Sequence, residues 1–273
     1  MKPGFFNHLL LFCQLELNRS FATRKGLLSM VTFAVVWYFI LLYPLRLAAD
    51  LMAQEHGISD HLSLLNFIGL DSIEHSAIPE FDVFWQLALI IFPVMSITLA
   101  ADQTCSDRIR GTLRFIVLRS SRDRVFFGRF AGVMLIQVLF ISAAAFSTLA
   151  LVMYRDASLF TVALTDLVVL IVDLVFIVLP FTAMMAALSA RVKSARQASL
   201  WAILIWTFMA GILNGLAYYL PGLDFLKLLI PGYQLSEVAQ LSGWQALQLA
   251  YVPFLQGFVL LGLGRWIMAR QAL

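Results

Sequence analysis

The chain has 273 residues, of which 61% are hydrophobic and 13% are charged, and its formal net charge at neutral pH is +3. So few charged residues leave too little polar surface for a water-soluble domain, since soluble proteins contain about 25% charged residues. The composition therefore excludes a soluble enzyme and indicates a polytopic membrane protein, for which we expect no nucleic-acid partner.

Apolar runs of about twenty residues recur along the chain, and each is long enough to cross a bilayer core as a helix. In lipid, the backbone polar groups of a spanning segment must be satisfied within that segment, and the alternation of a membrane β-barrel is absent. The sequence therefore predicts an all-α fold with six transmembrane helices, at about 27–47, 83–101, 129–153, 166–190, 198–220 and 246–266.

The lead that precedes the first span, residues 1–26, has an amphipathic pattern. Apolar side chains at Phe5, Leu9, Phe12 and Cys13 share one helical face, and amides occupy another. This pattern is typical of an interfacial helix that lies along a membrane surface. The alternative is an irregular start to the first span.

Most of the 19 Lys and Arg residues fall in the lead, in the connector 102–128, in the turn 191–197 and near the C-terminus. The segment 48–82 is instead acidic. Because loops rich in Lys and Arg stay in the cytoplasm, both termini are predicted to be cytoplasmic and the protein is placed in the cell's inner (plasma) membrane.

Two segments are predicted on the outer side, at 48–82 and 221–245. The first contains His56, His61 and His75 beside several carboxylates, but their spacings fit no metal-site template, so no metal is predicted. The second alternates turn residues with apolar clusters. It is interpreted either as a re-entrant hairpin that gates the outer side or as an amphipathic cap.

Asp173 is the clearest charged residue inside a predicted span. An acid at the bilayer centre costs about 2.5–3.5 kcal/mol, and less near the interface. Two interpretations remain open for it: a polar lining or proton site, and a structural hydrogen bond or protonated acid.

The connector between the second and third spans is rich in arginine. Ile109, Leu113, Ile116 and Val117 recur at helical spacing, which predicts one amphipathic helix over 106–120. Arg110 and Arg114 lie beside its apolar face, and Ser120 is expected to cap the next helix. Arginines here can anchor to anionic lipid. The apolar stripe favours a helix that docks on a cytoplasmic partner.

The same stretch resembles the ABC-2 type permeases, which are membrane subunits of ATP-binding-cassette transporters. The resemblance rests on Asp107, on Gly111-Thr112-Leu113, on Ser121-Arg122 and on Gly128-Arg129-Phe130, together with the six-span plan. Two departures are Ser120 in place of a common proline and Asp107 in place of the commoner Glu.

The resemblance implies an ABC-2 permease fold of the type V exporter kind, with residues 1–26 as an elbow helix and 106–120 as a coupling helix. It assigns ATPase coupling to Asp107, Arg108, Arg110, Gly111, Thr112, Leu113, Arg114 and Arg122. It also implies that spans two and five line a path between two permease subunits. Candidate path residues are Ser96, Thr98 and Asn214, with Asp173 added from its own chemistry.

Two pairs of glycines four residues apart are candidates for close helix packing. They are Gly128 with Gly132, and Gly211 with Gly215. Each pair suits either packing inside one bundle or a seam between subunits.

The sequence contains no P-loop, so the chain is expected to bind no cofactor and to be non-catalytic, with ATP and Mg held by a partner ATPase. The predicted function is a permease subunit that couples ATP hydrolysis, by two copies of a cytoplasmic ABC ATPase, to export of a substrate. A second permease subunit, identical or related, is the other expected partner. Alternatives are an ABC-type machine that acts on a companion protein, and a secondary transporter or channel.

Overall fold

A computed structural model describes residues 5–46, 78–219, 221–239, 241 and 244–270. These residues are helices and turns, and no strand occurs among them. Six helices within them are long and apolar enough to cross a membrane: Gly26–Leu45, Pro79–Ile109, Arg122–Arg155, Ala157–Arg191, Ala195–Leu216 and Tyr251–Arg270. The all-α prediction with six spans is confirmed, and the cytoplasmic placement of the termini stays a prediction.

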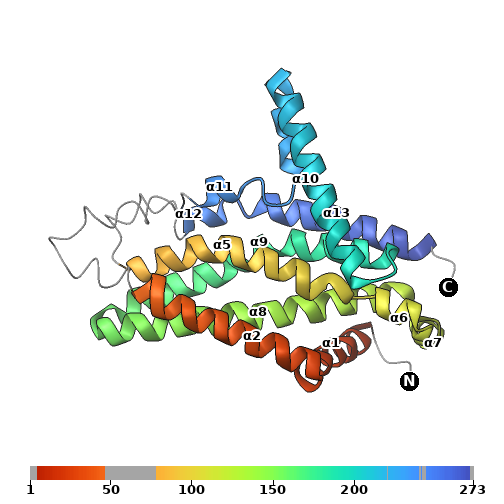
Figure 1. The fold of residues 1–273 in the computed structure, drawn as a ribbon, viewed down its shortest axis with the longest axis horizontal. Helices are drawn as coiled ribbons and strands as arrows, with labels where there is room; N and C mark the ends of the chain where they lie inside the picture. The colour runs from red at the N-terminus through yellow and green to blue at the C-terminus, as the bar shows by residue number, and fades with distance from the viewer. Residues whose placement is uncertain (1–4, 47–77, 220, 240, 242–243, 271–273) are drawn as a thin grey trace.

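Four long helices lie side by side and form the body of the protein (Figure 1). They are α5 (Pro79–Leu99), α8 (Arg122–Arg155), α9 (Phe160–Arg191) and α13 (Tyr251–Arg270). Large apolar side chains such as Phe84, Ile141 and Leu174 are fully enclosed between them. Lipid gives helices no hydrophobic reason to associate, so dense packing of this kind holds the bundle together.

The lead forms α1 (Phe5–Ala22), and the chain turns at Thr23 into α2 (Arg24–Ile40), which continues as the π-helical turn Leu41–Leu45. The Thr23 hydroxyl accepts a hydrogen bond from the Gly26 amide (3.2 Å), which is the usual way to cap a helix N-terminus. As a result α1 can pack across α8 while α2 starts a separate span.

The connector contains two short helices, so the prediction of one helix over 106–120 is wrong. After the 3₁₀ turn Ala100–Asp102, α6 covers Cys105–Ile109 and α7 covers Thr112–Arg119. Gly111 separates them with a φ of 71°, a left-handed conformation that glycine adopts without a steric penalty. The predicted cap is also shifted by one residue, because Ser121, and not Ser120, accepts from the Arg124 amide (3.4 Å).

Helix α10 (Ala195–Tyr219) projects away from the four-helix body (Figure 1). The chain then forms the 3₁₀ helix η6 (Pro221–Leu229), α11 (Leu235–Val238) and α12 (Trp244–Leu247) before it enters α13. One side-chain donor ties this return to α10, namely Trp206 to the Pro231 carbonyl (2.8 Å). Two others tie it to the bundle: Gln256 to the Leu228 carbonyl (2.6 Å) and Trp85 to the Val238 carbonyl (3.3 Å). Of the other predicted outer segment, residues 48–77 lie outside the described part of the chain.

Candidate functional site: the connector and its anchors

A buried arginine joins three elements at the connector end of the bundle. Arg129 of α8 has only 2% of its side chain exposed, and its guanidinium pairs with Asp107 of α6 and with Glu16 of α1 (3.6 Å to Glu16). It also donates to the Gln103 carbonyl, just before α6. A buried charge is costly unless it is paired and hydrogen-bonded, and here Arg129 has both kinds of partner.

A second ion pair ties α1 to the start of the connector. The Arg19 guanidinium of α1 lies 2.6 Å from an Asp102 carboxylate oxygen. Asp102 also accepts from the Ser106 amide (3.0 Å) and the Ser106 hydroxyl (2.6 Å) in the first turns of α6. Helix α1 therefore holds the entry to α6 through Asp102 and holds α8 through Arg129.

The ion pairs of Glu16 with Arg129 and Arg19 carry a desolvation cost. Burial raises the pKa of Glu16, and the opposing effect of Arg129 and Arg19 is smaller. Buried ion pairs often fail to recover their desolvation cost, and some fix a unique geometry instead. Burial also raises the pKa of the Cys13 thiol, with Glu16 as a second cause, so Cys13 stays protonated next to the Gly128 carbonyl.

Other residues of the predicted coupling set also bind within the chain. Arg108 donates to the carbonyls of Ala190, Arg191 and Val192, and Arg122 donates to that of Ala269 (2.8 Å). These carbonyls lie at the C-terminal ends of α9 and α13, where a cation complements the helix dipole and satisfies free acceptors. Leu113 is 1% exposed and packs in a cluster with Val125 and Phe126.

The opposite side of the connector is exposed. Ile109, Phe115 and Leu118 are 62%, 71% and 83% exposed, and Arg110 and Arg114 beside them are exposed as well. Within the described residues, neither arginine makes an ion pair. The predicted apolar stripe was wrong at Ile109, because the break at Gly111 turns α6 out of register with α7.

The eight predicted coupling residues therefore fall into two groups. Asp107, Arg108, Leu113 and Arg122 anchor the connector, and Thr112 donates to Asp107 (3.1 Å) across the break at Gly111. Arg110 and Arg114 are exposed. Sequence reasoning missed the roles of Glu16 and Arg129, although one signal was present: an acid within an apolar lead and a cation at the start of a span.

A chain of buried polar contacts continues from Arg129 into the bundle. Gln103, whose carbonyl accepts from Arg129, directs its side-chain amide to the Thr182 carbonyl (3.5 Å). The Thr182 hydroxyl donates to Gln137 (2.8 Å). The connector is thus linked by hydrogen bonds to the interior of α8 and α9.

The structure does not assemble the four predicted path residues. Ser96 and Asp173 are buried, whereas Thr98 and Asn214 are exposed. Ser96, Thr98 and Asn214 donate to carbonyls of their own helices. Among the described residues no hydrogen bond joins any two of the four, so their assignment to a path stays a prediction.

The two glycine pairs differ sharply in their surroundings. A Cβ at Gly128 would lie 2.7 Å from the Phe12 Cβ, and one at Gly132 would lie 2.8 Å from the Glu16 Cβ. Gly128 and Gly132 therefore let α1 approach α8 inside one chain. A Cβ at Gly211 or Gly215 would meet nothing within 4 Å.

Metal-binding chemistry finds no support in the part of the chain that the structure describes. No group of three or more His, Cys, Asp or Glu residues within it could hold a metal ion. Cys13 and Cys105 are both buried and free. The segment with His56, His61 and His75 lies outside the described residues.

Comparison with known families places these features in a known class. A family model described as an ABC-2 family transporter protein matches residues 13–256, which extend from α1 through the connector into α13. No curated protein matches the chain. Family membership implies an ABC ATPase as partner and a multi-pass location in a membrane. The chain belongs to the ABC-2 family of transporter proteins and is a permease subunit of an ABC transporter.

Proposed function

We propose that this permease subunit couples ATP hydrolysis by a separate cytoplasmic ABC ATPase to export of a substrate across the inner membrane. The observation that carries the proposal is the two-sided connector. One side presents Ile109, Phe115 and Leu118 with two arginines that make no ion pair within the described residues, and the other side is fixed to the bundle. ATP and Mg belong to the ATPase, and this subunit contributes no catalytic group.

The anchors explain how a push on the connector reaches the spans. Asp107 connects α6 to α8 through Arg129, and Arg108 connects it to the end of α9. Arg122 connects the start of α8 to the end of α13. A displacement of α6 and α7 would therefore move three spanning helices together, whereas a flexible loop would absorb it.

Arg110 and Arg114 suit recognition of an acidic cleft on the ATPase. Complementary charges at an interface raise the rate of encounter and fix the orientation of the partners. The exposed apolar side chains of Ile109, Phe115 and Leu118 supply the area that a partner can bury. Arg108, which the sequence grouped with these arginines, is already used inside the chain.

Charge reversal at the free arginines tests the docking. We expect Arg110→Glu with Arg114→Glu to abolish substrate-dependent ATPase stimulation and co-purification with the ATPase, since each reversed pair loses about 1.5 kcal/mol or more. Membrane insertion and melting temperature should stay unchanged. Arg196→Glu, at an exposed arginine in the first turn of α10, is the matched control and should retain coupling. Full coupling in the double variant would contradict the proposal.

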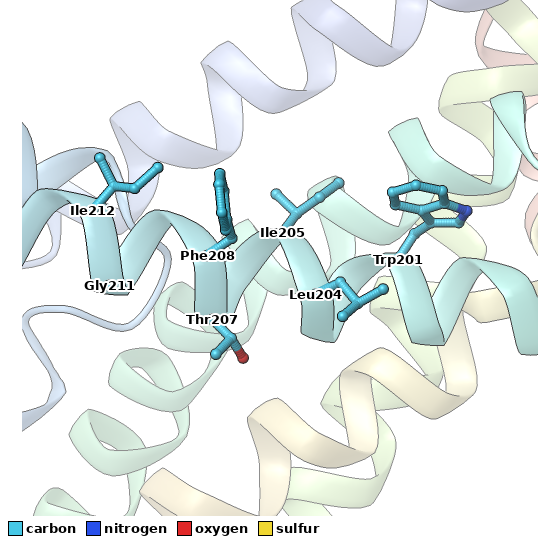
Figure 2. Close-up of a pocket in the computed structure, with 7 residues that line it drawn as sticks. All are labelled: Trp201, Leu204, Ile205, Thr207, Phe208, Gly211 and Ile212. Carbon is cyan, nitrogen blue, oxygen red and sulfur yellow. The ribbon is translucent and has the colours of Figure 1, made fainter.

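We further propose that a second permease subunit packs on α10. Trp201, Ile205, Phe208 and Ile212 point to one side of this helix, and Leu204 and Thr207 to the other (Figure 2). These side chains and Gly211 border an open apolar space of about 610 Å³, and no other described element lines it. With Gly211 and Gly215 open as well, α10 offers a small-residue face to a partner helix.

The same Gly→Leu substitution at Gly132 and at Gly211 distinguishes packing inside the chain from an interface between two permease subunits. Gly132→Leu should destabilise the subunit by about 1–3 kcal/mol, because the new side chain overlaps Glu16. Gly211→Leu should leave the melting temperature unchanged and lower the dimer fraction, measured by light scattering in detergent. An unchanged dimer fraction in Gly211→Leu would remove Gly211 from the seam.

A further inference from the structure

A carboxyl group lies buried in the bundle without a partner. Asp173 is in the middle of α9 and is 4% exposed. Within the described residues it makes no hydrogen bond and no ion pair. The other buried acids differ: Glu80 pairs with Arg155 (2.6 Å), and Glu16 pairs with Arg129.

Asp173 borders a small cavity under the segment that joins α10 to α13. We call the described residues 221–239 and 244–250 the return segment. The cavity measures about 10 Å³, and the return segment and the start of α13 cover it with Gln234, Val238, Ala246, Leu249, Ala250 and Pro253. Phe176 and Ile177 of α9 complete the lining. A space of this size accommodates one water, and among the described residues Asp173 and Gln234 are its only polar neighbours.

The lining selects among possible occupants. Hard cations require six or more oxygen ligands or their own water shell, and the cavity has neither the oxygens nor the room. Besides Asp173, every element that borders the cavity contributes only uncharged side chains to it. Asp166 of α9 and Glu237 of α11 are the nearest acids on the bordering helices, and neither lines the cavity. A proton is the one cation that the site fits.

We propose that Asp173 is a proton-binding site that controls the return segment: the protonated acid lets the segment close over α9, and the ionised carboxylate drives it open. An ionised carboxylate in this cavity would have at most one water and no counter-charge, which is costly in an apolar interior. Opening near Val238 admits water to the carboxylate. Because the closed form holds a proton that the open form releases, rising pH favours opening.

The contacts on either side of the cavity make such an opening local. Gln256 of α13 holds the segment at the Leu228 and Ile230 carbonyls (2.6 and 3.2 Å). Trp85 and Gln86 of α5 hold it at the carbonyls of Val238 (3.3 Å) and Ala239 (2.8 Å). The hydrogen bonds from Trp85 and Gln86 are at the cavity end of the segment and would have to break when it opens. The hydrogen bonds from Gln256 can persist.

Cysteine accessibility tests the proposal in the full-length chain, in nanodiscs and without an ATPase. Val238→Cys replaces a cavity-lining residue that is 4% exposed. Its alkylation by a hydrophilic maleimide is followed by mass spectrometry of the peptide that contains position 238. The same measurement on Val238→Cys with Asp173→Asn corrects at each pH for the reactivity of the thiol itself.

We expect the ratio of the two rates to rise by up to tenfold per pH unit over about pH 5 to 8, as one coupled proton requires. When Val238→Cys is combined with Asp166→Asn instead, the alkylation rate should depend on pH as it does in Val238→Cys alone. A ratio that does not depend on pH would overturn the proposal. So would a profile that Asp166→Asn abolishes.

Infrared spectroscopy gives a second readout that needs no cysteine. The parent chain at neutral pH should show a protonated carboxylic C=O band that shifts in deuterated buffer and is missing in Asp173→Asn. If no band is lost in Asp173→Asn, Asp173 is ionised and the proposal fails. Neither measurement involves the ATPase, so failure here is distinguishable from failure of the docking proposal.

Discussion

Arg129→Met should destabilise the subunit by about 3–5 kcal/mol, because it leaves buried carboxylates without their counter-charge. Arg129 is 2% exposed and pairs with Asp107 and Glu16. The measurement is the free energy of unfolding in mixed micelles, with the melting temperature in nanodiscs as a second readout. We also expect α1 to separate from α8, which limited proteolysis of residues 1–26 would detect.

Arg265→Met is the matched control for this change. Arg265 also pairs with an aspartate, Asp123 (2.9 Å), but the two side chains are 58% and 41% exposed. Exposed pairs contribute about 0–1 kcal/mol, so this variant should melt close to the parent. Equal losses of unfolding free energy in Arg129→Met and Arg265→Met would show that burial of Arg129 has no energetic role.

A neutralised network distinguishes charge from packing. Arg129→Met combined with Glu16→Gln and Asp107→Asn removes the carboxylate charges that the single variant leaves unpaired. Because the desolvation cost disappears with the charges, the triple variant should recover most of the stability. If it remains as unstable as Arg129→Met alone, the volume and hydrogen bonds of the arginine matter more than its charge.

Hydropathy was sufficient to predict the membrane class and all six spans, because backbone satisfaction in lipid forces a long apolar run to be helical. The limits of the connector were harder to predict. The periodicity of apolar residues predicted a helix that runs through Gly111. Only the backbone of the structure shows that Gly111 has a left-handed conformation, which ends α6. The register of Ile109 against Leu113 depends on that one residue.

The anchors of the connector could not be predicted because their partners are distant in the sequence. Glu16 and Arg129 are 113 residues apart, and Arg108 meets carbonyls more than 80 residues away. A motif shows which residue types are present, but it does not show which charges end up buried together. The sequence thus identified the connector and assigned its arginines to one role, whereas the structure divides them between anchoring and exposure.

The exposed leucine of α7 should matter for ATPase binding and its buried leucine for folding. Leu118→Ala together with Phe115→Ala should weaken ATPase binding by at least about tenfold, since apolar anchors at the centre of an interface often contribute 2 kcal/mol or more. These side chains are 83% and 71% exposed, so the melting temperature of the isolated subunit should not change. Binding is measured by titrating the ATPase onto the permease in nanodiscs.

Leu113→Ala makes the same chemical change five residues earlier in the same helix. Leu113 is 1% exposed and packs on Val125, Phe126 and Met268, so its truncation should cost about 2–5 kcal/mol of stability. The contrast between two leucines on opposite faces of α7 separates docking from anchoring. If Leu118→Ala with Phe115→Ala bound the ATPase normally, the exposed face of the connector would not be the docking surface, because its principal apolar area would be gone without consequence.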